Sequence, residues 1–215
     1  MKKHILLLSG LLLLTSLSAQ FKGFKSGVTA GVGVSQFSDN VNEPGAKVTN
    51  SIAFEAGMTS AFHFTKNLGL GLDVKFVSMG SRIEGRANGG VLGTNREDYR
   101  DTYKLSYIDV PLYAKLNIGL GNLYLSLFAG PSAQFSLKSV RERDWDGDNE
   151  DFEEEIKSGE AFVPAFNYGI GLHAKAANHV FYINLRAQVQ ADELGQINNV
   201  GTKINSSFLS VGYLF

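Results

Sequence analysis

The sequence predicts an all-β protein: an eight-stranded antiparallel up-and-down transmembrane β-barrel. Three observations lead to this prediction. The 215-residue chain has 24 glycines, 15 phenylalanines and 8 tyrosines but only 4 prolines, a composition that favours strands. After the first twenty residues, hydrophobic side chains alternate with small or polar ones in stretches about long enough to cross an outer membrane. The last stretch runs to the terminal residue, Phe215, whereas most soluble chains end in a frayed polar tail.

Residues 1–19 have the layout of a secretory signal peptide. A basic start precedes an apolar run over Ile5–Leu14, and small residues follow it. Cleavage is expected after Ala19, with cleavage after Ser18 as the alternative. The apolar run is shorter than the roughly 20 residues of a membrane-spanning helix, which argues against an uncleaved anchor. Residues 20–215 then form one barrel domain.

Eight stretches show the alternation of a half-buried strand. In order, and with the limits of their apolar faces, they are 25–37 (Val28 to Val34), 51–64 (Ile52 to Phe64), 68–76 (Leu68 to Phe76), 107–118 (Ile108 to Leu116), 122–135 (Leu123 to Ala133), 166–176 (Phe166 to Leu172), 180–190 (Phe181 to Val189) and 206–215 (Leu209 to Phe215).

The connections between these stretches alternate in length. Short links are expected at 65–67, 119–122 and 176–179, and long links at 38–48, 81–102, 138–160 and 192–202. Outer-membrane barrels have short periplasmic turns and long external loops, so this alternation predicts the orientation of the barrel. An even number of strands places both ends of the barrel on the short-turn side. The last strand must pair with the first, because an open strand edge in lipid is very costly.

The second face of the strands carries the charges. Its ionisable residues are Glu55, Asp73, Lys75, Asp109, Lys115, His173, Lys175 and Arg186. A cation at the middle of the lipid layer would cost about 2–4 kcal/mol, so this face is predicted to point into the lumen. Alternation alone does not say which face lies inside, and a soluble periplasmic lipocalin-like barrel with a ligand in its core stays open as an alternative.

An eight-stranded lumen is only wide enough for side chains to fill. Aromatic side chains such as Tyr113, Tyr124 and Phe128 are expected to occupy it, together with the charges. Gly31 and Gly71 are expected to relieve crowding there. Little or no solute flux is therefore predicted, with a narrow porin-like channel as the alternative.

Two central segments and the chain end carry a resemblance to known proteins. YIDVPLYAKL (Tyr107–Leu116) and LFAGP (Leu127–Pro131) resemble the PorT-like outer-membrane β-barrel family. The ending FLSVGYLF resembles the C-terminal signal that the barrel-assembly machinery reads. The resemblance covers essentially the whole chain after the signal peptide and implies an eight-stranded barrel in the outer membrane. It implies no defined activity, although some relatives take part in protein secretion, and it transfers no site residue.

One acidic segment has the spacing of a calcium-binding loop. Asp144, Asp146, Asp148 and Glu155 fall at positions 1, 3, 5 and 12, which suit the oxygen ligands of Ca²⁺. However, Asn149 and Asp151 replace the usual glycine and apolar residue, and no flanking helices are evident. The alternative is a solvated acidic external loop, and no metal site is predicted.

No catalytic residue or cofactor is predicted either. His63 and His173 lie beside short turns, away from the outer rim where a lipid-acting barrel enzyme would place its serine and histidine. They are interpreted as hydrogen-bonding or ion-pairing residues of the lumen. The chain has no cysteine, which excludes disulfides and thiolate metal sites, and a net charge of −1 gives no indication of nucleic-acid binding.

The expected function is therefore a structural, adhesive or secretion-accessory role through the external loops. The expected partners are outer-membrane lipid and lipopolysaccharide, the barrel-assembly machinery through the strand that ends at Phe215, and an unknown protein at the external loops. Arg82, Arg86, Arg96 and Arg100 are expected to pair either with the acidic third loop or with lipopolysaccharide phosphates.

Overall fold

The computed structural model describes residues 23–38, 47–89, 95–146, 152–155, 162–191, 196–197, 200–201 and 203–215. The predicted signal peptide lies outside these residues. Eight long strands are β1 (Phe24–Phe37), β2 (Lys47–His63), β3 (Leu68–Gly89), β4 (Asn95–Leu120), β5 (Leu123–Asp146), β7 (Phe162–Ala176), β8 (His179–Gln190) and β11 (Ile204–Leu214). Three short strands are β6 (Phe152–Glu155), β9 (Gln196–Ile197) and β10 (Val200–Gly201). Within the described part of the chain, no helix is long and apolar enough to cross a membrane.

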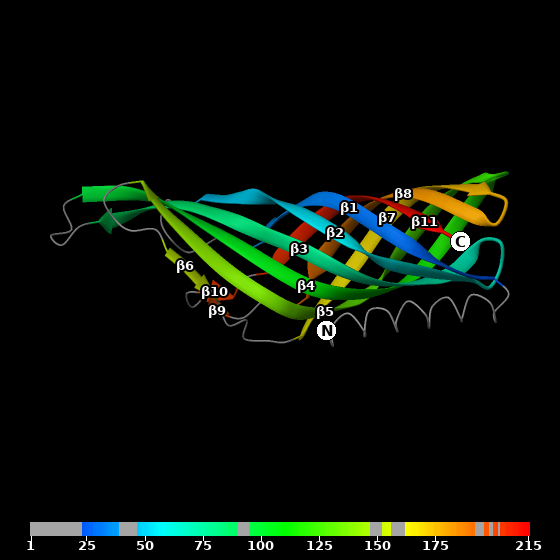
Figure 1. Cartoon of the computed structure of the whole chain (residues 1–215), viewed down its shortest axis with the longest axis horizontal. Helices are drawn as coiled ribbons and strands as arrows, with labels where there is room; N and C mark the ends of the chain where they lie inside the picture. The colour runs from blue at the N-terminus through cyan, green and yellow to red at the C-terminus, as the bar shows by residue number, and fades with distance from the viewer. Residues whose placement is uncertain are drawn as a thin grey trace, which may run out of the picture.

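The eight long strands form a closed antiparallel barrel (Figure 1). Each strand pairs with its neighbours along the chain, β5 pairs with β7, and β8 pairs with β11. The barrel closes between β1 and β11, from Gly27 opposite Leu214 to Phe37 opposite Ile204. This confirms the predicted eight-stranded up-and-down barrel, in which β11 supplies the hydrogen bonds that β1 needs for closure.

Tight turns lie at one end of the barrel, here named the short-turn end. They connect β2 to β3, β4 to β5 and β7 to β8, as predicted. Gly121 and Ala177 adopt the positive φ angles of 71° and 54° that such turns require. In the β2–β3 turn, the Thr65 hydroxyl accepts a hydrogen bond from the Leu68 amide at 2.9 Å.

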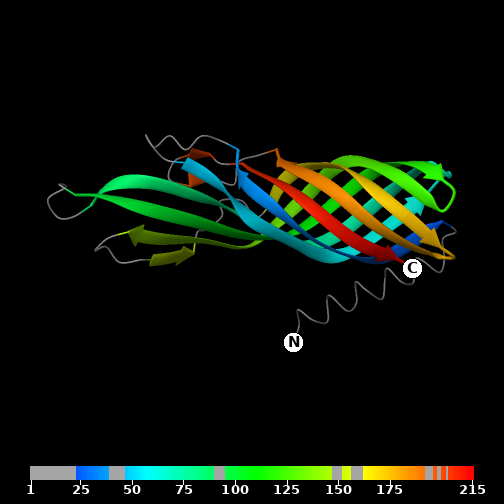
Figure 2. The same cartoon turned by 90° about the horizontal axis from the view of Figure 1, so that it is seen from above.

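At the opposite, extended end, β3, β4 and β5 continue far beyond the other strands (Figures 1 and 2). The prediction of long loops at 81–102 and 138–160 is therefore wrong over most of their length, because strand pairing extends to Gly89 opposite Asn95 and to Asp146 opposite Asp98. We name the protruding part the external sheet: β3 from Ser81, β4 to Leu105, β5 from Lys138, and β6, which pairs with β5.

Candidate functional site

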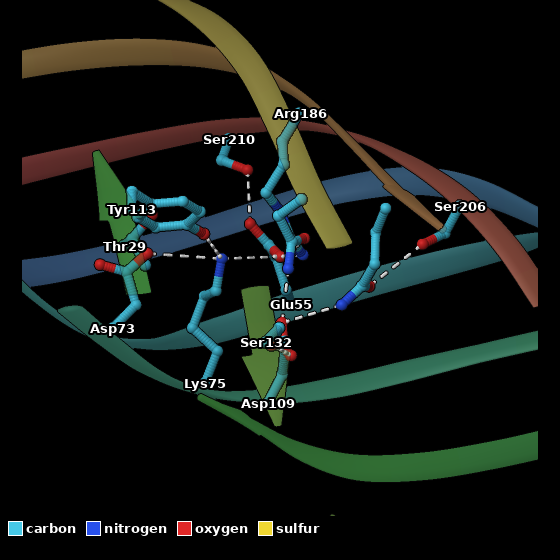
Figure 3. A network of polar contacts seen from close by, with 12 residues as sticks. Thr29, Glu55, Asp73, Lys75, Asp109, Tyr113, Ser132, Arg186, Ser206 and Ser210 are labelled. Atoms are coloured by element: carbon cyan, nitrogen blue, oxygen red, sulfur yellow. Dashed lines mark hydrogen bonds and ion pairs between the residues drawn. The ribbon is translucent and has the colours of Figure 1, made fainter. Parts of the chain in front are cut away.

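The middle of the lumen holds a buried network of charged side chains (Figure 3). Arg186 on β8 contacts Glu55 on β2, and its Nη1 lies 3.2 Å from Asp109 Oδ2 on β4. On β3, Lys75 Nζ lies 3.4 Å from Glu55 Oε2 and 3.5 Å from Asp73 Oδ2. All five side chains are at most 10% exposed. Because an unpaired buried charge is very costly, the two cations and three carboxylates are held in contact across four strands.

Hydroxyl and amide groups donate further hydrogen bonds to two of the three carboxylates. Ser210 Oγ donates a hydrogen bond to Glu55 Oε1 at 2.6 Å. The Ser132 hydroxyl donates to Asp109 Oδ1, and Gln188 Nε2 donates to Asp109 Oδ2 at 3.2 Å. The Glu55 and Asp109 carboxylates thus have both cationic and neutral donors, as buried carboxylates require.

An apolar layer fills the lumen between this network and the extended end. Its buried residues are Phe37, Ala53, Val77, Met79, Ile83, Tyr103, Leu105, Tyr107, Val163, Ile204 and Phe208. The rings of Phe37 and Tyr103 meet edge to face, with their centroids 5.2 Å apart. This layer separates the charged network from the external side.

A second apolar layer lies toward the short-turn end. It consists of Ala61, Val180, Tyr182 and Leu214, with Tyr124 packed against it. His173 stacks between Tyr124 and Tyr182, with ring centroids 4.8 and 5.1 Å away. His173 is therefore a lumen residue as predicted, but ring stacking is the contact that holds it.

Among the described residues, little free space is left beside the charged network. A cavity beside the charged network, lined by Thr29, Lys75 and Tyr113 among others, has a volume of about 10 Å³. That is room for a single water molecule. The predicted lumen residues Tyr113 and Phe128 are buried, whereas Lys175 lies exposed near the short-turn end and not in the lumen.

The outer surface of the barrel is an apolar belt. Its exposed large side chains include Val28, Val32, Ile52, Phe54, Leu72, Leu116, Leu127, Ile170, Leu185 and Val211. Aromatic residues border the belt at both ends. At the short-turn end the ring centroids of Phe181 and Tyr213 lie 4.9 Å apart, and toward the extended end those of Phe135 and Phe162 lie 5.7 Å apart. A barrel in lipid has its apolar residues outside and its charges inside, as this one does. The soluble-barrel alternative requires the reverse.

The outer face of the external sheet carries cross-strand ion pairs. They are Arg86 Nε with Asp98 Oδ1 (2.6 Å), Arg100 Nε with Glu84 Oε1 (3.5 Å) and Lys104 Nζ with Glu142 Oε1 (2.5 Å). Among the described residues, Arg86 and Arg100 thus pair within their own hairpin rather than with the acidic segment. Arg82 has no carboxylate within 4 Å among the described residues, and the side chain of Arg96 lies outside them.

The inner face of the external sheet holds two arginines on one carboxylate. Asp101 Oδ2 lies 2.6 Å from Arg141 Nη2, and Asp101 Oδ1 lies 2.5 Å from Arg143 Nε. The Arg143 guanidinium also lies over the rings of Tyr99 (4.5 Å) and Trp145 (5.2 Å). The hydrogen bond with Asp101 raises the pKa of Arg143, so this arginine stays charged at any physiological pH.

The calcium-loop hypothesis does not match the strand geometry. Asp144 and Asp146 belong to β5, where they oppose Arg100 and Asp98 on β4. Glu155 on β6 opposes Val140, four residues along β5 from Asp144. At roughly 3.3 Å per residue this separation is about 13 Å, too long for positions 1 and 12 to share one ion. Asp148 lies outside the described residues, and those that are described contain no cluster of three candidate metal ligands.

Sequence reasoning missed the external sheet and the apolar layers of the lumen. A usable signal was present: Tyr99, Tyr103 and Leu105 extend a period of two backward from Tyr107, the first residue of the predicted fourth strand. Charged residues interrupt the apolar pattern there, and they were assigned to a loop. In the structure these charges lie on the solvated face of the same strand, or pair with other charges.

The chain resembles several solved outer-membrane proteins. Ail, the attachment invasion locus protein of Yersinia pestis, is 14% identical with a TM-score of 0.43, and the match covers 91% of this chain and all of Ail. Neisserial surface protein A is 13% identical with a TM-score of 0.43, covering 90% and 96%. The outer membrane protease OmpT of Escherichia coli is 9% identical with a TM-score of 0.39, covering 89% and 95%. No protein of curated function matches the sequence.

Residues 18–189 match the outer membrane protein beta-barrel domain family, which is most of the chain. The match agrees with the closed barrel, its apolar belt and its charged lumen, and it implies a location in the outer membrane. The chain therefore belongs to the outer membrane protein beta-barrel domain family.

Proposed function

We propose that this protein is a non-enzymatic, non-conducting outer-membrane barrel that binds a protein partner through its external sheet, in an adhesive, structural or secretion-accessory role. The observation that carries the proposal is strand length. β3, β4 and β5 have 22, 26 and 24 residues, whereas a membrane-spanning strand needs about 9–11. The additional residues of these strands form the external sheet, in which Asp101 holds Arg141 and Arg143 in place. The PorT-like resemblance over Tyr107–Leu116 and Leu127–Pro131 supports the secretion-accessory form of this role.

A narrow channel is the second candidate, and the filled lumen opposes it. Two apolar layers enclose the charged network, and the cavity beside it holds about one water. In planar bilayers the purified protein is expected to give no stable current steps. Reproducible steps at low voltage would overturn the non-conducting part of the proposal.

The position of the histidines supports a non-enzymatic role. His63, His173 and His179, the histidines among the described residues, belong to the ends of β2, β7 and β8 that meet the short turns. An enzyme that acts at the external side needs its general base at the opposite end of the barrel. Incubation with lipid and peptide substrates is expected to show no turnover.

Two further partners belong to the proposal. Arg82 and Lys138 lie on β3 and β5 above the belt, and neither has a carboxylate within 4 Å among the described residues, so both are available to lipopolysaccharide phosphates. The strand that ends at Phe215 is the segment that the barrel-assembly machinery would read. No cofactor, metal or nucleic acid enters the proposed function.

Photo-crosslinking in whole cells tests the role of the external sheet. A photoreactive amino acid is placed at Arg86 or Asp144 on the sheet, and at Leu185 in the belt as the matched control. Discrete protein adducts are expected from the sheet positions, and none from Leu185, whose side chain faces lipid. If neither sheet position gives an adduct, the proposed function is wrong.

A further inference from the structure

Beyond the barrel, one edge of β5 is only partly covered. β7 pairs with β5 from Leu123 to Phe135, and β6 pairs with it only from Val140 to Arg143. Among the described residues, no strand pairs with this edge at 136–139 or at 144–146. Unpaired N–H and C=O groups on such an edge form a template for another extended segment.

The side chains beside this edge are held in fixed positions. Asp101 is 2% exposed and binds both Arg141 and Arg143, at 2.6 and 2.5 Å. Tyr103 lies 5.9 Å from the Arg141 guanidinium, and Tyr99 lies 4.5 Å from that of Arg143. Two oriented guanidinium planes are therefore available to an aromatic ring on an added strand, without the cost of ordering them at the moment of binding.

β6 shows which side chain fits these arginines. The ring of Phe152 lies 5.7 Å from the guanidinium of Arg141 and 5.7 Å from that of Arg143. Phe152 opposes Arg143 in the register, and Glu154 opposes Arg141. An aromatic residue followed two positions later by an acidic one thus complements the inner face of this edge.

The hold of β6 on this edge is weak. The strand has four residues, and all four are exposed. Glu153 stands opposite Glu142, which already pairs with Lys104 at 2.5 Å. Like charges directly opposite each other on paired strands are destabilising. A strand with a basic residue at this position would pair with β5 better than β6 does.

We propose that the β5 edge is a docking site for an extended segment of a protein partner, and that β6 is an internal competitor for it. The segment carries an aromatic residue opposite Arg143, a basic residue opposite Glu142 and an acidic residue opposite Arg141. Binding adds a strand to the external sheet and displaces β6. This inference rests on the proposed function and deepens it, since it names the surface and the chemistry of the partner.

A peptide-binding experiment on the full chain in detergent micelles tests the inference. The probe is a synthetic peptide that copies residues 151–156 with lysine in place of Glu153, and a second peptide with the native glutamate is the comparison. Trp145 is the only tryptophan of the chain and lies 5.2 Å from the Arg143 guanidinium, so its fluorescence reports on this edge. The lysine peptide is expected to bind about fivefold more tightly than the glutamate peptide.

Variants of the chain separate competition from ordinary contact. Phe152→Ala weakens the internal competitor and is expected to tighten peptide binding about threefold to tenfold. Arg143→Ala removes the site and is expected to weaken binding at least about tenfold, also in the Phe152→Ala background. Lys47→Ala removes an exposed cation of β2 outside the external sheet and is expected to leave the affinity unchanged. Each variant is first checked for the heat-dependent gel mobility of a folded barrel.

The outcomes are distinct. Equal affinity of wild type and Phe152→Ala overturns β6 as a competitor, and binding that survives Arg143→Ala overturns the docking site itself. If the peptides fail while the crosslinks from Arg86 and Asp144 persist, the external sheet binds its partner elsewhere and only this inference falls. If the crosslinks also fail, the proposed function falls with it.

Discussion

At the scale of the residue, Arg186 decides the charge balance of the lumen. It contacts Glu55, lies 3.2 Å from Asp109 and has its guanidinium 4.8 Å from the ring of Phe208. Arginine suits this position because its planar fork binds several acceptors at once and stacks on an aromatic ring. Period-two alternation placed Arg186 inside, but the identity of its partners on β2 and β4 depends on the register of the closed barrel.

Removal of Arg186 is expected to be strongly destabilising. Arg186→Met leaves the buried Asp109 without its cation and Glu55 with Lys75 alone, and it should cost about 3–5 kcal/mol of unfolding free energy. Arg86→Met, which breaks an exposed pair of the external sheet, is the matched control and should cost at most about 1 kcal/mol. Urea titration in phospholipid vesicles, read from the folded fraction on unboiled gels, measures both. Equal costs for the two variants would contradict the proposed role of the network.

A glycine of the last strand makes room for a ring inside the barrel. A Cβ on Gly212 would lie 2.1 Å from Tyr182 Cζ, whereas one on Gly119 would meet nothing within 4 Å. Gly212→Ala should therefore destabilise the barrel by about 1–3 kcal/mol through overpacking. Gly119→Ala should change the stability by no more than about 0.5 kcal/mol. The same urea titration compares them, and a neutral Gly212→Ala would show that Tyr182 can move aside.

The predicted role of other glycines follows the same principle. A Cβ on Gly31 would lie 2.5 Å from Ser210 Oγ, and one on Gly71 would lie 2.4 Å from Lys115 Cε. Both glycines were expected to relieve crowding in the lumen, and these contacts support that interpretation. Side chains from neighbouring strands occupy the space that the glycines leave.

At the scale of the element, the barrel strands and the external sheet are separable. Among the described residues, β2 pairs with β3 only up to Glu84, opposite Lys47, and β4 is the partner of β3 beyond Glu84. The barrel strands below keep every pairing that closes the barrel. The part of the external sheet beyond Glu84 is thus an addition to a complete barrel rather than a part of its closure.

Shortening the β3–β4 hairpin is expected to leave assembly intact. Replacement of residues 85–99 by an Asn-Gly turn joins Glu84 to Arg100, which already face each other across the hairpin. Heat-dependent gel mobility should be retained, and the fluorescence of Trp145 should change because Tyr99, 5.8 Å away, is lost. Failure to assemble would mean that the external sheet is needed for folding.

At the scale of the whole molecule, the barrel has its apolar side chains outside and its charged side chains inside, the reverse of a soluble barrel. This arrangement suits a lipid environment. Leu185 is 56% exposed and Ile52 83% exposed, while Asp109 is fully buried. Contact with lipid has no free-energy cost for the apolar belt, whereas contact with water would be unfavourable. The external sheet, with its ion pairs, lies beyond this belt.

Quenching by brominated acyl chains tests this placement. Leu185→Trp in a Trp145→Phe background should be strongly quenched in vesicles of brominated phospholipid, because the new side chain lies in the belt. The native Trp145, on the external sheet, should keep its fluorescence. Strong quenching of Trp145, or none at position 185, would contradict the placement of the belt and of the external sheet.

The sequence by itself determined the fold class, the face of each strand and the closure by the last strand. These properties are local: a period of two assigns each side chain to one face, and charges select the face away from lipid. Only the tertiary structure decided which charges meet, how the lumen divides into layers and how far β3, β4 and β5 extend. Those properties depend on the register between strands that are distant in the chain. A polar segment can be either a solvated strand or a loop, and only its pairing with another strand distinguishes the two.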